Sequence, residues 1–405
     1  MSQSHPGRDR VVAHVIAEFS AKEAMGRTVT EAARRIPGRH VLVTSRAHDG
    51  AEPFDEVVEL GGPMGTFPLQ VREPLATALQ RIRPDVVHLH AGALGPFLAL
   101  ATDLRRHPLV TTLYAWPTLP APLAWKRSGI AEMRASNVLQ PRVVATTVLT
   151  PGMVRSALRR AGASTVLSPD PRVLERLGPA LGRGAGAAPV LRLPSGAPQD
   201  DRRAHFDADH PVVVFGGRAE TVRGVDTLLS AFPQVLRQVP SVRLRLLLIP
   251  RPELPSILER SGASGLGDAL EVVTEPVPDL LAELAAAQVG AWPFKFDYVT
   301  SPPAMAVAEA MSVGLPVVST PVACVRAVMR PGVDGLAVPP ADATALAAAI
   351  TRLLTDRDEW DRFAEAGPAA TRERFGWDRA AEVTAAAYDR ATMSTSSGVS
   401  PGARA

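Results

Sequence analysis

Short apolar runs alternate with amphipathic segments along the N-terminal half of the chain. The first apolar run is followed by a turn through Gly26 and by a helix around Thr28–Arg35. Strands that alternate with helices in this way indicate a parallel sheet with crossover helices. We therefore predict one doubly wound α/β domain here, with strands at Val11–Ala17, His40–Thr44, Asp85–His90, Leu109–Leu113, Val143–Leu149 and Thr165–Ser168.

The same alternation starts again after a polar segment. We predict a strand followed by a Pro/Gly turn within Ala188–Pro198, and the following Gln199–His210 is polar and loop-like. Beyond it, the apolar positions of Val225–Val239 recur with a period of 3.6 residues, which predicts an amphipathic helix. A second doubly wound α/β domain is therefore predicted, with strands at Pro211–Phe215, Val242–Ile249, Leu270–Val273, Val289–Trp292 and Pro316–Ser319.

The composition narrows the possible function classes. A chain of 405 residues is too long for one ordinary hydrophobic core. The net charge is only +3 and the arginines are scattered, so we expect no nucleic-acid partner. The single cysteine, Cys324, excludes an internal disulfide framework. No run approaches the ~18 apolar residues of a membrane span, and the first ten residues do not resemble a secretory leader. We therefore expect a cytoplasmic protein without integral membrane contact.

A glycine-arginine motif follows the first strand of the second domain. Phe215-Gly216-Gly217-Arg218 precedes Arg223-Gly224 and an apolar helix. Glycine at a strand end lets the backbone approach a ligand, and the N-terminus of the next helix favours an anion. Arg218 and Arg223 add permanently charged, bidentate donors. The motif predicts a diphosphate site; the alternative is a pair of solvated arginines beside a structural turn.

One acidic residue stands in an otherwise apolar segment. Pro302 and Pro303 favour the start of a helix, and Gly314 favours its end, so Glu309 is the only acid of a helix between two core strands. Burial of a carboxylate costs several kcal/mol unless it has partners. Two ribose hydroxyls would be suitable partners. The alternative is a glutamate that caps the backbone or pairs with an arginine.

The first domain offers two candidate site residues. Gly26 lies in the first strand-to-helix loop, where a backbone can approach a donor phosphate or an acceptor. His88 and His90 share one face of a strand, and His90 is nearer to the carboxyl end, where ligands bind in open α/β sheets. His90 is therefore a candidate catalytic residue; the alternative is a structural histidine with satisfied hydrogen bonds.

Together these residues resemble glycosyltransferase family 4, the large retaining family with the GT-B architecture of two facing Rossmann-like domains. The resemblance covers nearly the whole chain and is most specific at Gly217–Asp226, Glu309–Val318 and Gly332–Pro340. It implies an acceptor domain over residues 1–198 and a nucleotide-sugar donor domain over residues 199–373.

The C-terminal segment also resembles the family. Residues 374–391 look like its terminal helix, which crosses back to the first domain. Residues 392–405 are rich in small and polar residues, and we predict that they form a disordered tail.

The resemblance also assigns donor-binding positions. The family positions that match Arg218 and Arg223 bind the diphosphate, the second being usually lysine, and the position of Glu309 holds the ribose. Gly217 belongs to the same donor motif. In this chain Ser301 replaces a second glutamate that contacts the transferred sugar.

The loop around Ser301 departs further from the family. The next residues usually give backbone N–H groups to sugar and phosphate, but Pro303 has none. Ala304 and Met305 remain as donor-binding candidates, and Asp297 is an alternative sugar contact.

The expected activity follows from these assignments. Fixed positive groups stabilise the departing nucleotide diphosphate, so we expect no metal and no cofactor besides the nucleotide sugar. We predict a retaining glycosyltransferase that uses a GDP- or UDP-linked donor, with an unusual sugar as one option, and a small-molecule acceptor in specialised-metabolite biosynthesis. The alternatives are a lipid or polysaccharide acceptor, and a nucleotide-binding homologue that has lost transfer activity.

Overall fold

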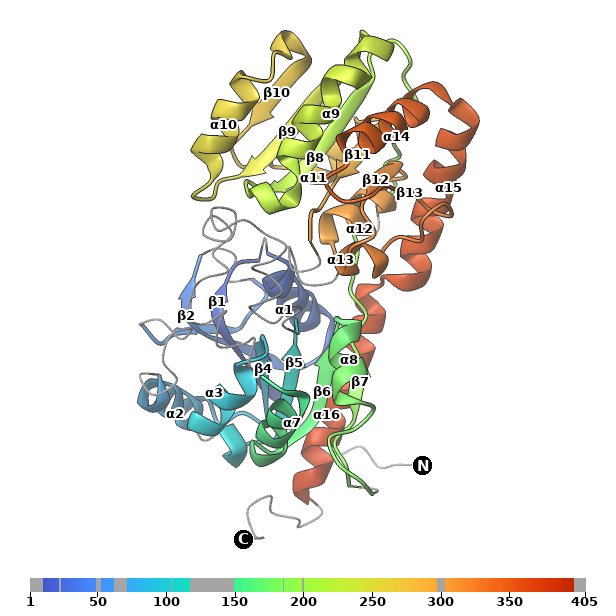
Figure 1. Ribbon diagram of the computed structural model, residues 1–405. Helices are drawn as coiled ribbons and strands as arrows, with labels where there is room; N and C mark the ends of the chain where they lie inside the picture. Colours follow the sequence, from blue (N-terminus) through green and yellow to red (C-terminus); the bar gives the residue numbers. More distant parts are fainter. Residues whose placement is uncertain are drawn as a thin grey trace. The chain divides into compact units, whose positions relative to one another are not determined.

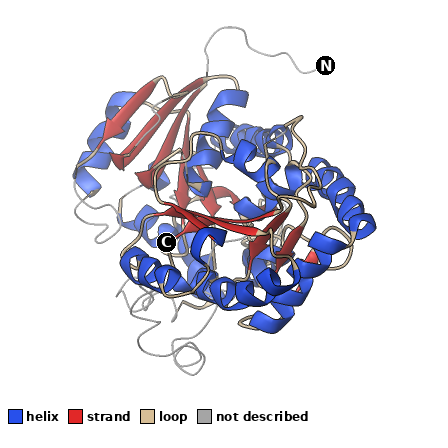
Figure 2. Ribbon diagram, turned by 90° about the horizontal axis from the view of Figure 1, so that it is seen from above, coloured by secondary structure: helices blue, strands red, loops and turns tan. Residues whose placement is uncertain are grey.

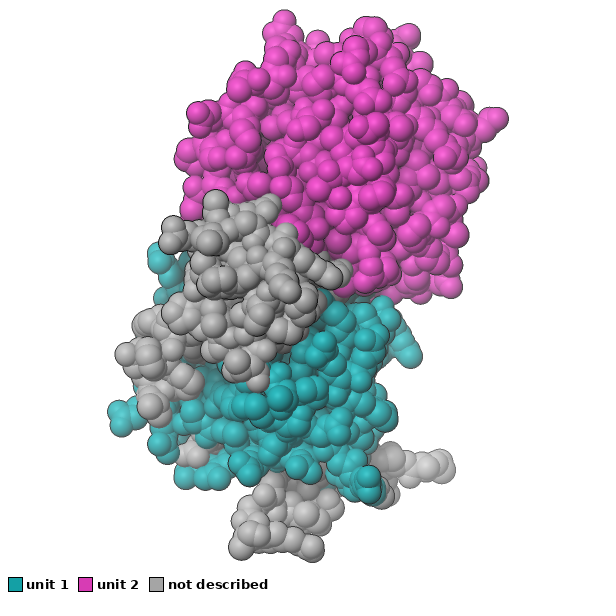
Figure 3. Space-filling model, viewed as in Figure 1, with its two compact units in different colours: residues 1–117, 148–196, 377–405 teal, residues 118–147, 197–376 magenta. Residues whose placement is uncertain are grey.

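The protein divides into two compact units (Figure 3). Unit 1 combines three stretches of chain, 1–117, 148–196 and 377–405, and unit 2 comprises 118–147 and 197–376. The computed structural model describes residues 10–21, 23–48, 52–61, 71–102, 104–116, 149–184, 186–198, 200–296 and 303–396.

Unit 1 is built on a parallel sheet that has seven strands in the described part of the chain. The strand order is β3-β2-β1-β4-β5-β6-β7. Strands β2 and β3 are added on one side of β1 and the later strands on the other, so a topological switch point lies between β1 and β4. In open α/β sheets, ligands bind at the carboxyl ends of the strands beside such a switch point. The strands are β1 (Val11–Phe19), β2 (Arg39–Ala47), β3 (Glu56–Glu59), β4 (Val86–Ala91), β5 (Leu109–Leu113), β6 (Ala163–Ser168) and β7 (Val190–Arg192).

Helices cover both faces of this sheet (Figures 1 and 2). Alternate residues of β1 point to opposite faces, as the period of a strand requires. Ala13 and Val15 pack with α2, whereas Val12 packs with α1 and α16. The helices of unit 1 are α1 (Ala24–Arg35), α2 (Arg72–Ile82), α3 (Gly95–Ala101), α7 (Pro151–Arg160), α8 (Pro171–Leu177) and α16 (Trp377–Ser396), with a short 3-10 turn at Leu104–Arg106.

The C-terminal helix α16 belongs to unit 1, as the sequence indicates. It lies beside α1 and beside strands β4, β5 and β6 (Figure 1). It begins at Trp377 and not at residue 374, and it ends later than predicted, because residues 392–396 are helical. Within this added turn, the Thr392 hydroxyl donates to the backbone carbonyl oxygens of Tyr388 and Asp389, 3.2 and 3.0 Å away.

Unit 2 has the same organisation around a second parallel sheet, with six strands among the described residues. The order is β10-β9-β8-β11-β12-β13, and its switch point lies between β8 and β11. The strands are β8 (Val212–Arg218), β9 (Arg243–Ile249), β10 (Leu270–Val273), β11 (Val289–Trp292), β12 (Val317–Ser319) and β13 (Leu336–Ala337). The predicted class of two doubly wound α/β domains is therefore confirmed.

The core of unit 2 contains large side chains that are almost fully buried, including Phe215, Phe232 and Trp292. Helix α9 lies beside α14, and α12 lies beside α15. The helices are α9 (Val225–Gln238), α10 (Leu254–Gly262), α11 (Leu280–Ala285), α12 (Met305–Ser312), α13 (Ala323–Arg326), α14 (Ala343–Thr355) and α15 (Arg357–Arg374), with 3-10 turns at Thr221–Arg223 and Gly267–Ala269.

Some sequence predictions differ from the structure in detail. Strands β3 and β13 are not predicted, and both are short edge strands. The predicted strand Val143–Leu149 lies outside the described residues except for Leu149, which is not in a strand. Among the described helices, none combines the length and the hydropathy of a membrane span.

Candidate functional site

The glycine-arginine motif forms a tight corner between β8 and α9. Arg218 is the last residue of β8, and the 3-10 turn Thr221–Arg223 leads into Gly224, which has a φ of 83°. A Cβ atom on Gly224 would lie 1.9 Å from the carbonyl oxygen of Pro293. Only glycine therefore fits, both for its left-handed conformation and for its close approach to the segment after β11. This fixes the N-terminus of α9 at the carboxyl edge of the sheet.

Arg223 is a largely buried cation in this corner. Its side chain is 13% exposed, and its Nε donates to Glu220 Oε2 at 2.9 Å. Its guanidinium carbon lies 6.0 Å from the ring centre of Phe294. Burial lowers the pKa of Arg223, and the Glu220 carboxylate opposes that shift. An arginine stays protonated in proteins, so this is a partly desolvated positive charge, which attracts anions more strongly than a solvated one.

The structure adds Lys295 to this corner, a residue to which sequence analysis gave no role. Its Nζ lies 2.7 Å from Asp226 Oδ2, in the first turn of α9. The sequence feature that could have indicated this role is the position of Lys295, just after a core strand, in a chain that has few lysines.

The helix that carries Glu309 follows next in unit 2. Glu309 lies on α12 and is 4% exposed, so the predicted burial of this carboxylate is confirmed. The backbone N–H of Ala304 donates to the carbonyl oxygen of Cys324 at 3.0 Å, so a structural bond already uses it. Met305 is the first residue of the helix and is half-buried. Ser301 and Asp297 lie outside the described residues.

Residues 320–324 connect the arginine corner with the start of this helix. The backbone carbonyl of Cys324 accepts from Ala304, and Thr320, four residues earlier, donates to the carbonyl oxygen of Phe294, whose ring lies under the Arg223 guanidinium. The corner and the N-terminus of α12 are therefore neighbours within unit 2. This is the grouping that the donor prediction needs, although the roles of these residues stay predictions.

The two candidates in unit 1 have internal structural explanations. Gly26 lies in the first turn of α1 and not in the preceding loop, which corrects the predicted start of this helix. A Cβ atom there would lie 2.0 Å from the Ser20 carbonyl oxygen, so the glycine lets the helix pack against its own entry turn. His90 is 3% exposed at the carboxyl end of β4.

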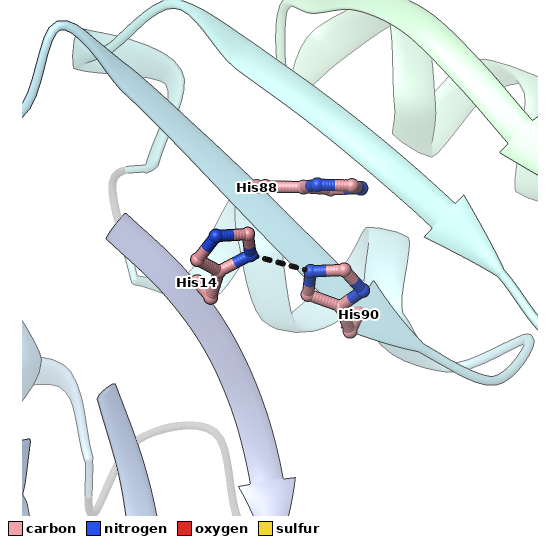
Figure 4. A group of neighbouring side chains, drawn as sticks. All are labelled: His14, His88 and His90. Atoms are coloured by element: carbon pink, nitrogen blue, oxygen red, sulfur yellow. Dashed lines mark hydrogen bonds between the residues drawn. The ribbon is translucent and has the colours of Figure 1, made fainter. Parts of the chain in front are cut away.

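Both ring nitrogens of His90 take part in a buried hydrogen-bonded chain. Its Nε2 lies 3.1 Å from His14 Nδ1 (Figure 4). Its Nδ1 lies 3.1 Å from the Tyr114 hydroxyl. His14 Nε2 lies 2.9 Å from His40 Nδ1. The chain ends where His40 Nε2 lies 2.8 Å from the carbonyl oxygen of Ile36.

The carbonyl at the end fixes every proton in this chain. Burial, followed by the neighbouring imidazoles, lowers the pKa of His14 and His90 well below the ordinary value, and burial lowers that of His40, so all three rings are neutral. The Ile36 oxygen can only accept, so His40 Nε2 carries a proton and its Nδ1 accepts from His14. By the same rule His14 accepts from His90. His90 in turn accepts from the hydroxyl of Tyr114.

His88 joins the cluster from the same strand as His90 (Figure 4). Its Nδ1 lies 2.8 Å from the Tyr388 hydroxyl on α16, and its Nε2 lies 2.7 Å from the Thr112 hydroxyl. Burial also lowers its pKa well below the ordinary value. The ligand atoms of His14, His88 and His90 lie within 4.8 Å of one another, a spacing that a metal ion requires. All six ring nitrogens have hydrogen-bond partners, however, and a metal would have to replace some of these bonds.

Comparison with known proteins agrees with this organisation. Residues 210–356, which include the arginine corner and α12, match the family described as "Glycosyl transferases group 1". The D-inositol 3-phosphate glycosyltransferase of Nocardioides sp. is 29% identical over 369 residues, covering 85% of this chain and 76% of that protein. The glycogen synthase of Mycobacterium tuberculosis is 26% identical over 397 residues, covering 87% and 86%.

Solved structures show the same fold. Sucrose-phosphate synthase from Thermosynechococcus elongatus superposes with a TM-score of 0.72 at 20% identity, covering 95% of this chain and all of that one. Anabaena Alr3699/HepE, solved in complex with UDP and glucose, gives a TM-score of 0.69 at 16% identity, covering 93% and 99%. Residues 210–356 of this chain therefore match a group 1 glycosyltransferase domain, and the chain has the fold of the GT-B glycosyltransferases to which it is similar.

Proposed function

We propose that this glycosyltransferase takes a sugar from a GDP- or UDP-linked donor whose diphosphate binds at the β8–α9 corner, without a metal ion and with retention of anomeric configuration. The observation that carries the proposal is the placement of Arg218 and Arg223 beside the N-terminus of α9. Breaking the sugar–phosphate bond develops negative charge on the diphosphate. Fixed cations and unpaired helix N–H groups at that point lower the barrier.

Glu309 is the proposed partner of the nucleotide ribose. It is buried on α12, whose N-terminus lies next to the arginine corner through residues 320–324. A buried carboxylate that accepts from two hydroxyl groups recovers part of the cost of its desolvation.

The proposed acceptor is a small molecule, and the proposed setting is specialised-metabolite biosynthesis. The relative named D-inositol 3-phosphate glycosyltransferase supports a small acceptor. The family resemblance supports an altered sugar pocket, because it implies a glutamate at the position of Ser301. A serine makes fewer demands on the sugar hydroxyls than a carboxylate, so an unusual donor sugar would be accommodated.

Nucleotide binding and sugar transfer together test this proposal. Calorimetry with UDP and GDP identifies the base, and transfer is then measured with a panel of nucleotide sugars. We expect Arg218→Ala and Arg223→Ala each to reduce transfer at least tenfold, because a charge-assisted hydrogen bond contributes about 1.5–3 kcal/mol and about 1.4 kcal/mol is a factor of ten. The matched control is Arg237→Ala, an exposed arginine at the other end of α9.

Several results would contradict parts of the proposal. Normal turnover by both arginine variants would place the diphosphate elsewhere. A reaction that EDTA abolishes and a divalent metal restores would contradict metal independence, and a product of inverted anomeric configuration would contradict retention. The named glycogen synthase relative favours one second candidate, a polysaccharide acceptor, which an oligosaccharide in the acceptor panel would reveal.

A further inference from the structure

We propose that Lys295 is a third cation of the donor diphosphate site and that Asp226 holds its ammonium group in place. The inference rests on the proposed function, since it concerns the same β8–α9 corner. Sequence and family resemblance direct attention to Arg218 and Arg223, but the structure places a third positive group beside them.

The backbone of Lys295 is bound to the loop that carries Arg223. Lys295 follows β11, which pairs in parallel with β8, so the residues after both strands meet at one edge of the sheet. The Lys295 N–H donates to the carbonyl oxygen of Val222 at 3.0 Å. The close approach of Gly224 to Pro293 fixes the same two segments against each other. The backbone of Lys295 is therefore fixed within the corner, and the lysine side chain extends from a defined position there.

The side chain is directed to the start of α9. Its Nζ lies 2.7 Å from Asp226 Oδ2, and the lysine side chain is 13% exposed. The second oxygen of Asp226, Oδ1, is buried and has no hydrogen-bond partner among the described residues. Lys295 is thus the cation that compensates this carboxylate. An ammonium group has three N–H donors, so its bond to Asp226 does not prevent it from donating to a phosphate oxygen.

The charges of the corner show why a third cation matters. Glu220 pairs with Arg223, and Asp226 pairs with Lys295. Among these described residues, removal of Lys295 would leave Arg218 and Arg223 with the carboxylates of Glu220 and Asp226, and this set of four residues has no net charge. Arg260 and Glu253, which both hydrogen bond to Thr221, offset each other and do not change this balance. Lys295 gives this set of described residues a net positive charge, which favours a dianionic group.

The alternative is that Lys295 and Asp226 form a structural ion pair only. The two roles differ in their ligand dependence. A contact with the diphosphate affects nucleoside diphosphates more than nucleoside monophosphates, whereas a structural defect affects both alike.

Binding of UDP, GDP, UMP and GMP to the full chain distinguishes these roles. Wild-type protein is measured first, and if it binds neither UDP nor GDP, the proposed function itself fails. Given wild-type binding, we expect Lys295→Met to weaken diphosphate binding at least tenfold and monophosphate binding less than threefold. Lys295→Arg should recover most of the affinity. The matched control is Arg245→Met, which breaks ion pairs with Glu271 and Glu283 in the same unit but away from the corner.

A second measurement keeps the inference testable if the methionine variant does not fold. The wild-type chain is acetylated at lysine with and without nucleotide, and the modified residues are identified by mass spectrometry. We expect UDP or GDP to protect Lys295 and the free nucleoside to leave it reactive. Unchanged diphosphate affinity in Lys295→Met, equal losses for diphosphate and monophosphate, or equal acetylation with and without the diphosphate would overturn the inference.

Discussion

The buried histidine cluster predicts that unit 1 loses stability as the pH falls below about 6.5. The perturbation is a change from pH 7.5 to pH 5.5. Burial, more than any neighbouring charge, lowers the pKa of His14, His88 and His90 well below the ordinary value, so the folded protein keeps these rings neutral. In the unfolded chain each ring takes up a proton near its ordinary pKa of about 6.5. The unfolded state therefore binds more protons, and the free energy of unfolding decreases with falling pH.

The size of the effect follows from the number of neutral rings. At a pH one unit below the pKa of a histidine, its protonation lowers the free energy of the unfolded state by about 1.4 kcal/mol. Three rings that stay neutral in the folded state together lower the free energy of unfolding by about 4 kcal/mol between pH 7.5 and pH 5.5. That is a large part of the ~5–15 kcal/mol that stabilises a typical domain. The loss begins near pH 6.5 and continues towards the lowered pKa values of the folded state.

Amide hydrogen exchange measures this prediction for each unit separately. Peptides from β1 and β4 report on unit 1, and exchange is corrected for its intrinsic pH dependence. Unit 2 is an internal control, because His205 and His210, the histidines that the structure describes there, are exposed. His14→Gln should reduce the pH dependence of unit 1 by about 1.4 kcal/mol. A change in unit 1 of less than about 1 kcal/mol between the two pH values would refute the assignment of neutral rings.

Two further substitutions test the packing that positions these sites. Gly224→Ala should destabilise unit 2 by at least about 2 kcal/mol and abolish nucleotide binding, because the backbone is left-handed there and the new Cβ would clash with the Pro293 carbonyl. Thermal unfolding measures the loss of stability. The control is Gly262→Ala, where a Cβ has open space. Tyr388→Phe should destabilise unit 1 by about 1–3 kcal/mol, because it leaves a buried nitrogen of His88 without its partner. Thr392→Val, on the same helix, controls for loss of a hydroxyl, and equal denaturation curves for the two variants would contradict the role of Tyr388.

The order of strands and helices could be predicted because each half of the chain repeats one simple pattern. Buried strands such as Val289–Trp292 are uniformly apolar, and the following helices carry clear apolar faces. The edge strands β3 and β13 have only half-buried or exposed residues, so their pattern is weak. Local patterns thus predict the central elements better than the edges.

The candidate site could be predicted only where its residues are close in sequence. Arg218 and Arg223 lie five residues apart, so a single motif contains them. Lys295 reaches the same corner from a different strand, and no local pattern connects it to Asp226. His90 was correctly placed at a strand end, but its partners come from elements far away along the chain. Contacts of this kind depend on the packing of the whole unit.

Helix α16 makes unit 1 a discontinuous domain, and this affects the order in which the protein can fold during synthesis. The hydroxyl of Tyr388 is the hydrogen-bond partner of His88, and His88 is synthesised 300 residues before Tyr388. The stretch 197–376, which contains all the described residues of unit 2, is made in the interval. Because domains generally fold as units, unit 2 can reach its native state before α16, the last helix of unit 1, has been synthesised. During that interval the surface that α16 covers, including the ring nitrogen of His88 that Tyr388 binds, lacks its partner.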